Sequence, residues 1–221
     1  ADQLTESLGA IAVQQRAYAN NNPRAIMRDR GMTMDDYRAA RMISWPLRLF
    51  DLCLENDGAV AFVIARADRT GGVGEPVRIL AATQSLAPYH EPFGIYTPDM
   101  ATFYPKEATE RLYRNAGVPA SRIRVAGLYD ACSYMTMRSM ESYDLVPERT
   151  GWRHVVEAGI GPDSPVPVNT HGGHLSEGYL HGMNAVTEMV RQLRGESANQ
   201  VAGADVALVG SPSGSAVVLA R

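Results

Sequence analysis

Apolar residues recur with helical spacing along several stretches of the chain. The clearest case lies just before Gly195, where Val186, Met189, Val190 and Leu193 follow one another at i, i+3, i+4 and i+7. One face of this helix is therefore apolar, and Gly195 is suited to end it. Spacing, caps and breaks predict four further helices: over residues 2–20, from Thr33 to about Met42, from Pro105 to about Ala116, and from about Ala131 to Tyr143.

Short apolar runs predict strands between these helices. Residues 59–65 (AVAFVIA) form an uninterrupted run, which favours a strand covered on both faces, with a short buried helix as the alternative. Further strands are predicted over residues 77–83, 123–128, 206–209 and 216–219. Because strands alternate with helices, the fold class that we expect is α/β, with a layered sheet.

Glycines and prolines mark the breaks in the pattern. Residues 70–74 (TGGVG) form the clearest hinge and the predicted domain boundary. Residues 84–104 show no periodicity, so they predict a long loop, and long loops in compact domains are often functional.

Composition and charge exclude several function classes. The chain has 221 residues, of which 45% are hydrophobic and 20% charged, with a net charge of −3. A mildly acidic chain without a basic stripe is a poor partner for nucleic acid. No apolar run is long enough to span a membrane. Two cysteines make no disulfide framework and there is no signal peptide, so we expect a cytoplasmic protein.

Groups that transfer protons gather in residues 169–182 (NTHGGHLSEGYLHG), between glycines that let the backbone approach other groups closely. This density indicates one wall of an active site. His171 and His174 lack a third ligand at helical spacing, so no metal site is predicted. His181 is either part of the site or simply solvated, and the sequence leaves both open.

Four boxes, in order along the chain, resemble those of the thiolase superfamily. Residues 56–59 (NDGA) resemble its N-D-G-A turn, and residues 129–132 (YDAC) occupy the place of its N-E-A-F box. Residues 169–182 match its glycine and histidine box, and residues 207–214 its final A-L-C-x-G-G-G segment. The resemblance implies a thiolase-like layered fold, αβαβα when complete, of which this chain covers mainly the C-terminal half.

The same resemblance divides the chain. Residues 1–74 correspond to the end of the loop region and the last strand of the N-terminal thiolase-like domain, and residues 75–221 to the C-terminal domain. The half that carries the nucleophilic cysteine of thiolases has no counterpart here. We therefore expect the missing N-terminal half, or a homologous chain, to complete the fold.

Three catalytic positions of thiolases are changed within the boxes. Tyr129 stands at the box asparagine, Tyr179 at the box histidine and Val209 at the second cysteine. A Claisen thiolase needs a thiolate to hold an acyl group and a second cysteine to move a proton, and Val209 cannot titrate. Two phenols can instead donate a hydrogen bond to an oxyanion and act as a general base. Reverse aldol cleavage of a 3-hydroxyacyl thioester needs only those functions.

This pattern resembles the thiolase-like aldolases of actinobacterial steroid side-chain breakdown. The resemblance implies cleavage of a 17-hydroxy steroid-20-carboxyl-CoA to a 17-ketosteroid and propionyl-CoA. It also implies a DUF35 partner with an OB-fold and zinc, in a dimer of heterodimers. Tyr129 and Tyr179 are carried over as the catalytic pair, without deciding which is base and which is acid. The steroid identity rests on the resemblance alone.

The resemblance also suggests substrate-binding residues, namely His171, Gly172, Gly173, Cys53 and Cys132. The two cysteines are expected to pack or bind rather than to attack. CoA belongs to the substrate, and no cofactor or metal is expected in this chain. Because tyrosines are common half-buried residues, a structural role for Tyr129 and Tyr179 is the plainer alternative.

Two other functions remain open. One is a thiolase-type acyltransferase that uses a cysteine from the missing half, against which Val209 argues. The other is a non-catalytic subunit that binds acyl-CoA or sterol, against which the two tyrosines argue mildly.

Overall fold

The computed structural model describes residues 2–69, 75–85, 106–211 and 214–221. Its centre is a four-stranded sheet in the order β3-β6-β5-β4. The strands are β3 (Arg78–Gln84), β4 (Val125–Leu128), β5 (Val206–Gly210) and β6 (Ser215–Ala220). Strands β4 and β5 are parallel and the other neighbours antiparallel. All four were predicted from apolar runs, and the α/β fold class is confirmed.

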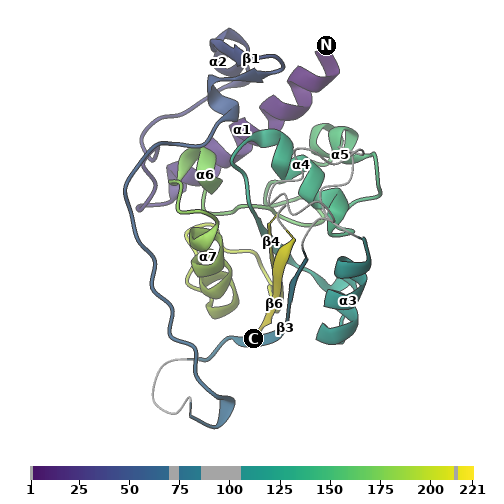
Figure 1. Cartoon of the computed structure of the whole chain (residues 1–221). Coiled ribbons are helices and arrows are strands. Elements are labelled where there is room, and N and C mark those ends of the chain that lie inside the picture. Colours follow the sequence, from purple (N-terminus) through teal and green to yellow (C-terminus); the bar gives the residue numbers. More distant parts are fainter. Residues whose placement is uncertain (1, 70–74, 86–105, 212–213) are drawn as a thin grey trace.

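Helices cover both faces of this sheet, with α7 (Met183–Arg194) on one side and α3 (Lys106–Ala116) on the other (Figure 1). Because successive residues of a strand point to opposite sides, β4, β5 and β6 each contribute to two cores. Leu208 and Val218 belong to the larger core, which includes residues of α3. Ala207 and Leu219 pack with Met189 of α7. This two-sided burial explains why the strands read as uninterrupted apolar runs.

The predicted helices are confirmed, with small differences at their ends. Besides α3 and α7 they are α1 (Asp2–Asn21), α2 (Met34–Ala39) and α4 (Ser133–Ser142). Helix α2 begins with a capping box between Thr33 and Asp36. It ends at Ala39 rather than near Met42 because the chain enters a hairpin of β1 (Met42–Ser44) and β2 (Leu47–Arg48). Two short helices were not predicted, α5 (Gly151–Glu157) and α6 (Gly173–Ser176).

The strand predicted over residues 59–65 is wrong, and so is the alternative of a short buried helix. Residues 53–66 have no regular secondary structure, and Figure 1 shows this stretch running along the outside of the molecule. Val63 is 97% exposed and Ile64 is 79% exposed. A strand needs a neighbour to accept its backbone hydrogen bonds. None of the strands in the described ranges pairs with this run.

Helix α1 lies against α4, α5 and α6, and its Leu8 and Ile11 belong to the larger core. The hinge predicted at residues 70–74 lies outside the described residues. So does the loop predicted over 84–104, apart from Gln84 and Ser85. The division at residue 74 therefore stays a prediction. None of the helices within the described ranges has the length and apolarity that crossing a membrane requires.

Candidate active site

The fold brings together the two tyrosines that the sequence singled out. Tyr129 and Tyr179 are 50 residues apart, yet their hydroxyl oxygens lie 2.7 Å from each other. Their rings meet edge to face, with centroids 6.2 Å apart. Tyr129 is 8% exposed, and Tyr179 is half-buried. The pair is close enough to share a proton through one hydrogen bond.

Each tyrosine is held by its backbone. Tyr129 follows β4, and its N–H donates to the carbonyl of Gly210 at 2.9 Å, which continues the parallel pairing of β4 with β5. Tyr179 lies on the loop between α6 and α7, and its N–H donates to Oδ1 of Asn56 at 2.7 Å. Asn56 belongs to the NDGA turn, so that turn positions the second tyrosine. The resemblance identified this turn, but no role was predicted for Asn56.

The ring of His174 in α6 contacts both phenol rings edge to face, with its centroid 5.0 Å from each. Its Nδ1 lies 3.0 Å from Oδ1 of Asp130. Its Nε2 accepts from the N–H of Gly182 at 2.9 Å and lies 3.1 Å from Oδ1 of Asn184. Burial lowers the pKa of His174 to about 3, so its imidazole is uncharged at neutral pH. Burial also raises the pKa of Asp130 well above its usual value, and the N–H groups that point at its carboxyl oppose that shift.

We expect the NMR signals of His174 to stay constant between pH 8 and 5, because its pKa lies near 3. The unfolded chain takes up this proton below about pH 6.5 and the folded chain does not. His174 therefore contributes stability that is lost as the pH falls below that value. A titration midpoint of the His174 signals near pH 6.5 would show that the imidazole is not buried as described.

The pKa of Tyr129 is raised, first by burial and then by its hydrogen bond with Tyr179. Tyr129 therefore keeps its proton at neutral pH and can act as a hydrogen-bond donor. On the other side of the pair, the hydroxyl of Tyr179 lies 3.2 Å from Nδ1 of His181, which is exposed.

A groove of about 630 Å³ opens beside Tyr129 and His181. It lies between the start of α7 and the neighbouring strands β3, β5 and β6. Apolar side chains supply much of its wall, among them Met183, Val186, Val209 and Val217. An apolar groove with a few polar groups at one end is typical of a small-molecule site.

The five residues predicted to bind substrate do not line this groove. His171 is 2% exposed, and in the described part of the chain neither of its ring nitrogens has a hydrogen-bond partner. Its Nε2 lies 3.8 Å from Oε2 of Glu177. Gly172 and Gly173 have φ angles of +109° and +62° and pack against Ala19 of α1 and the carboxyl of Asp130, respectively. Their roles in substrate binding stay predictions.

Cys53 and Cys132 lie near each other in the structure, and both are free thiols. The N–H of Cys53 donates to the carbonyl of Ala131 at 3.0 Å, and Cys132 precedes α4. Burial raises the pKa of both thiols, which keeps them protonated and poorly nucleophilic. Their predicted contact with substrate is untested.

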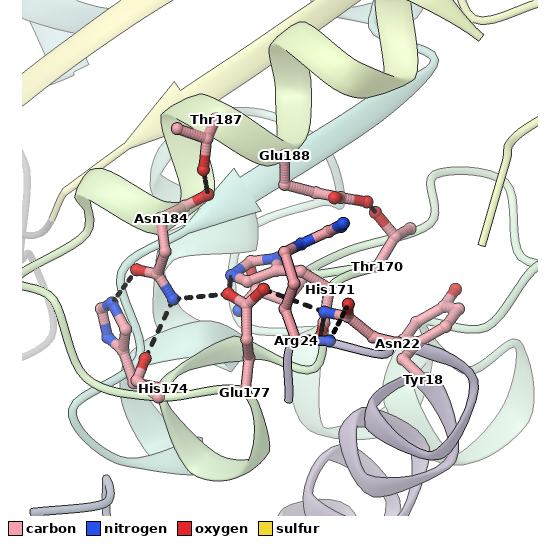
Figure 2. A network of polar contacts seen from close by, with 12 residues as sticks. Tyr18, Asn22, Arg24, Thr170, His171, His174, Glu177, Asn184, Thr187 and Glu188 are labelled. Atoms are coloured by element: carbon pink, nitrogen blue, oxygen red, sulfur yellow. Dashed lines mark hydrogen bonds and ion pairs between the residues drawn. The ribbon is translucent and has the colours of Figure 1, made fainter. Parts of the chain in front are cut away.

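A polar network that includes His174 links α1, α6 and α7 (Figure 2). Asn184 lies between His174 and Glu177, and its Nδ2 donates to Oε2 of Glu177 at 2.9 Å. Asn22 at the end of α1 donates to Oε1 of the same carboxylate, also at 2.9 Å. Thr170 donates to Glu188 of α7 at 2.7 Å. Pattern reasoning missed Asn22, Asn184 and Glu188, because nothing in their spacing marks them as partners.

Metal-binding geometry is not found in the described ranges, where no three His, Cys, Asp or Glu side chains converge as ligands.

Residues 94–218 match the family described as thiolase C-terminal domain-like. The chain is 35% identical over 218 residues to a 17-hydroxy-3-oxo-4-pregnene-20-carboxyl-CoA lyase of Mycobacterium tuberculosis, which covers 95% of this chain and 55% of the relative. It is 30% identical over 205 residues to a steroid side-chain-cleaving aldolase of Thermomonospora curvata, covering 89% of this chain and 51% of the relative.

Among solved structures, the chain resembles an Ltp2-ChsH2(DUF35) aldolase with a TM-score of 0.92 and 29% identity. That match covers 98% of this chain and 58% of the other. The chain thus spans about half the length of the curated relatives that it matches. The family match covers more than half of the residues and contains the box around Tyr179 as well as Tyr129. This chain belongs to the thiolase C-terminal domain-like family.

Proposed function

We propose that this chain carries the catalytic tyrosines of an aldolase, a carbon–carbon lyase that cleaves a 3-hydroxyacyl-CoA thioester by a retro-aldol reaction. The substrate that we propose is a 17-hydroxy steroid-20-carboxyl-CoA, which yields a 17-ketosteroid and propionyl-CoA. The observation that carries the proposal is the Tyr129–Tyr179 hydrogen bond of 2.7 Å beside a largely apolar groove. The names of the two curated relatives, a lyase and a side-chain-cleaving aldolase, support it.

The two phenols divide the chemistry between them. Tyr129 keeps its proton, because its pKa is raised, and donates to the thioester oxygen on which negative charge develops. Tyr179 takes the proton of the substrate hydroxyl. The alkoxide then collapses to the ketone as the Cα–Cβ bond breaks, and the bond electrons form the enolate. The enolate takes up a proton at Cα to give propionyl-CoA.

The groove suits the apolar part of such a substrate. Ala82, Met183, Val186 and Val217 offer it hydrocarbon surface, and Tyr129 lines the same groove. Val209 also lines the groove, at the position where the resemblance places a thiolase cysteine. Its side chain cannot move a proton, which disfavours the acyltransferase alternative.

The assembly around the chain belongs to the same proposal. Because the relatives are about twice as long, the missing N-terminal half or a homologous chain would complete the site, with the division near residue 74. The name of the Ltp2-ChsH2(DUF35) aldolase supports a DUF35 partner, for which we propose an OB-fold with zinc and a dimer of heterodimers. CoA would enter as part of the substrate, without a further cofactor, and the assembly would work in the cytoplasm.

The direct test supplies the assembly with the 17-hydroxy steroid-20-carboxyl-CoA and follows the products by mass spectrometry. We expect the 17-ketosteroid and propionyl-CoA in equal amounts. Tight binding of the thioester without either product would favour the non-catalytic alternative. Acyl transfer to a second CoA thioester would favour the acyltransferase.

Alkylation of cysteines should leave turnover intact. The proposed reaction forms no acyl-enzyme, and both thiols of this chain are held protonated by burial. We expect nearly full activity after treatment with iodoacetamide, measured under conditions in which mass spectrometry confirms that the exposed thiols have reacted. An acyl group trapped on any cysteine by rapid quenching would contradict the retro-aldol mechanism.

A further inference from the structure

We propose that His181 accepts the proton that Tyr179 passes on, so that Tyr179 and His181 form a relay from the substrate hydroxyl to solvent, with Tyr129 hydrogen-bonded to Tyr179. The proposal rests on the proposed function and adds a third residue to it. His181 acts through Tyr179, which is the group that meets the substrate hydroxyl.

The distances arrange the three groups in a row. The Tyr129 and Tyr179 hydroxyls lie 2.7 Å apart, and the Tyr179 hydroxyl lies 3.2 Å from Nδ1 of His181. The imidazole leans over the Tyr179 ring, with centroids 4.6 Å apart. Before substrate binds, the O–H of Tyr129, which keeps its proton, can donate to the Tyr179 oxygen. Tyr179 is then free to donate to His181.

His174 touches the same rings but cannot take this role. Its Nε2 is engaged by the N–H of Gly182 at 2.9 Å, and its Nδ1 faces Asp130 at 3.0 Å. It is fully buried, and burial lowers its pKa to about 3, so it resists a positive charge. His181 is exposed, and water can stabilise its charged form.

The backbone holds His181 in a conformation that its side chain does not favour. Its φ is +51°, in the left-handed region, and the next residue, Gly182, has a φ of +84°. This region is unfavourable for residues other than glycine. The left-handed bend turns the chain between Tyr179 and α7, and it places the imidazole back against Tyr179. Strain of this kind is concentrated at functional sites.

Among the residues that the structure describes, the groups that face His181 leave it as the proton acceptor. Tyr179 comes from its own loop, Tyr129 from the end of β4 and His174 from α6. Across the groove, β3, β6 and the end of β5 contribute the neutral polar side chains of Thr83, Gln84, Ser211 and Ser215. None of these neutral groups takes a proton at neutral pH.

The proton balance of the step is simple. The substrate hydroxyl gives its proton to the Tyr179 oxygen as the Tyr179 proton moves to Nδ1 of His181. The C–C bond breaks, and the enolate later takes one proton from solvent at Cα. His181 returns its proton to solvent through the groove, so the enzyme ends in its starting state.

The experiment compares His181→Gly and His181→Asn in the active assembly. Glycine and asparagine both tolerate the left-handed conformation, so the loop should fold in each variant. We expect kcat to fall roughly 10- to 100-fold in both, as for loss of a proton-transfer group. The dependence of kcat on pH should also change, because both variants lack the imidazole that accepts the proton. Added imidazole should restore much of the activity of His181→Gly and little of that of His181→Asn, whose side chain fills the space.

A measurement without turnover separates this proposal from the function on which it rests. If Tyr179 donates to Nδ1, the neutral His181 ring carries its proton on Nε2, which nitrogen chemical shifts report. Tyr179→Phe should abolish this preference for the tautomer protonated on Nε2. An unchanged tautomer balance in Tyr179→Phe, or wild-type kcat and pH profile in His181→Gly, would overturn the relay. Full activity in Tyr179→Phe would instead refute the proposed function.

Discussion

Replacing Tyr179 by phenylalanine should lower kcat by about 100-fold or more in the active assembly, because general acid–base groups contribute about 10²–10⁴-fold. Phenylalanine keeps the ring, so the edge-to-face contacts with Tyr129 and His174 remain. Only the hydroxyl is lost, and with it the group that takes the substrate proton. KM should change little if the hydroxyl acts mainly in the transition state.

Tyr129→Phe should cause a loss of similar size, since it removes the donor to the developing enolate. The double variant should be scarcely slower than the slower single variant, because the two hydroxyls share one hydrogen bond and act as a unit. Multiplied losses would indicate that the two phenols act independently.

Tyr37 of α2 offers a matched control. It is fully buried, and its hydroxyl donates to Oδ2 of the buried Asp51 at 2.8 Å. Tyr37→Phe should therefore lower the free energy of unfolding by about 1–3 kcal/mol and leave kcat near the wild-type value. If Tyr179→Phe behaved like Tyr37→Phe, losing stability but keeping kcat, Tyr179 would be a structural residue.

The tyrosine pair was predicted from the resemblance to the thiolase boxes. Those boxes place Tyr129 directly after a strand and Tyr179 in a glycine-rich loop. The pairing itself depends on β4 lying next to β5, where Tyr129 N–H meets Gly210. Periodicity predicts each strand but not which strand lies beside it.

The failures have physical causes as well. The run at residues 59–65 has the hydropathy of a covered strand, yet hydropathy does not say which surface covers it. The groove is built from β3, β5, β6 and the start of α7, which meet only after the chain has folded. Asn56 acts through a hydrogen bond to Tyr179, far along the chain, and Asn184 through contacts with His174 and Glu177; such contacts leave no periodic trace. Helix α6 spans four residues, too few for a helical repeat to show.

The structure shows how tightly the glycine pair is packed. The resemblance suggested that Gly172 and Gly173 support the substrate, which stays a prediction. Both lie where the box packs against α1 and Asp130. A glycine at 173 lets the backbone of α6 approach that carboxyl group closely.

Gly173→Ala should therefore lower the free energy of unfolding by roughly 3 kcal/mol or more. Two causes add up: a non-glycine residue in the left-handed conformation, and overpacking. A Cβ atom at this position would collide with Oδ2 of Asp130 and would lie 2.6 Å from Oε1 of Gln15. Neither the Asp130 nor the Gln15 side chain can move away easily. The Asp130 carboxylate accepts the N–H of His174 at 3.0 Å and is 1% exposed, and Gln15 is fully buried.

Gly117→Ala separates the two causes of that loss. Gly117 has a φ of +69°, close to the +62° of Gly173, but no atom of the described residues lies within 4 Å of its added Cβ. Its replacement should cost only about 1–2 kcal/mol, the price of the left-handed conformation. Urea unfolding with a shared m-value would compare the two variants. Equal losses of unfolding free energy would mean that the side chains around Gly173 move aside, and that Asp130 is not held firmly next to His174.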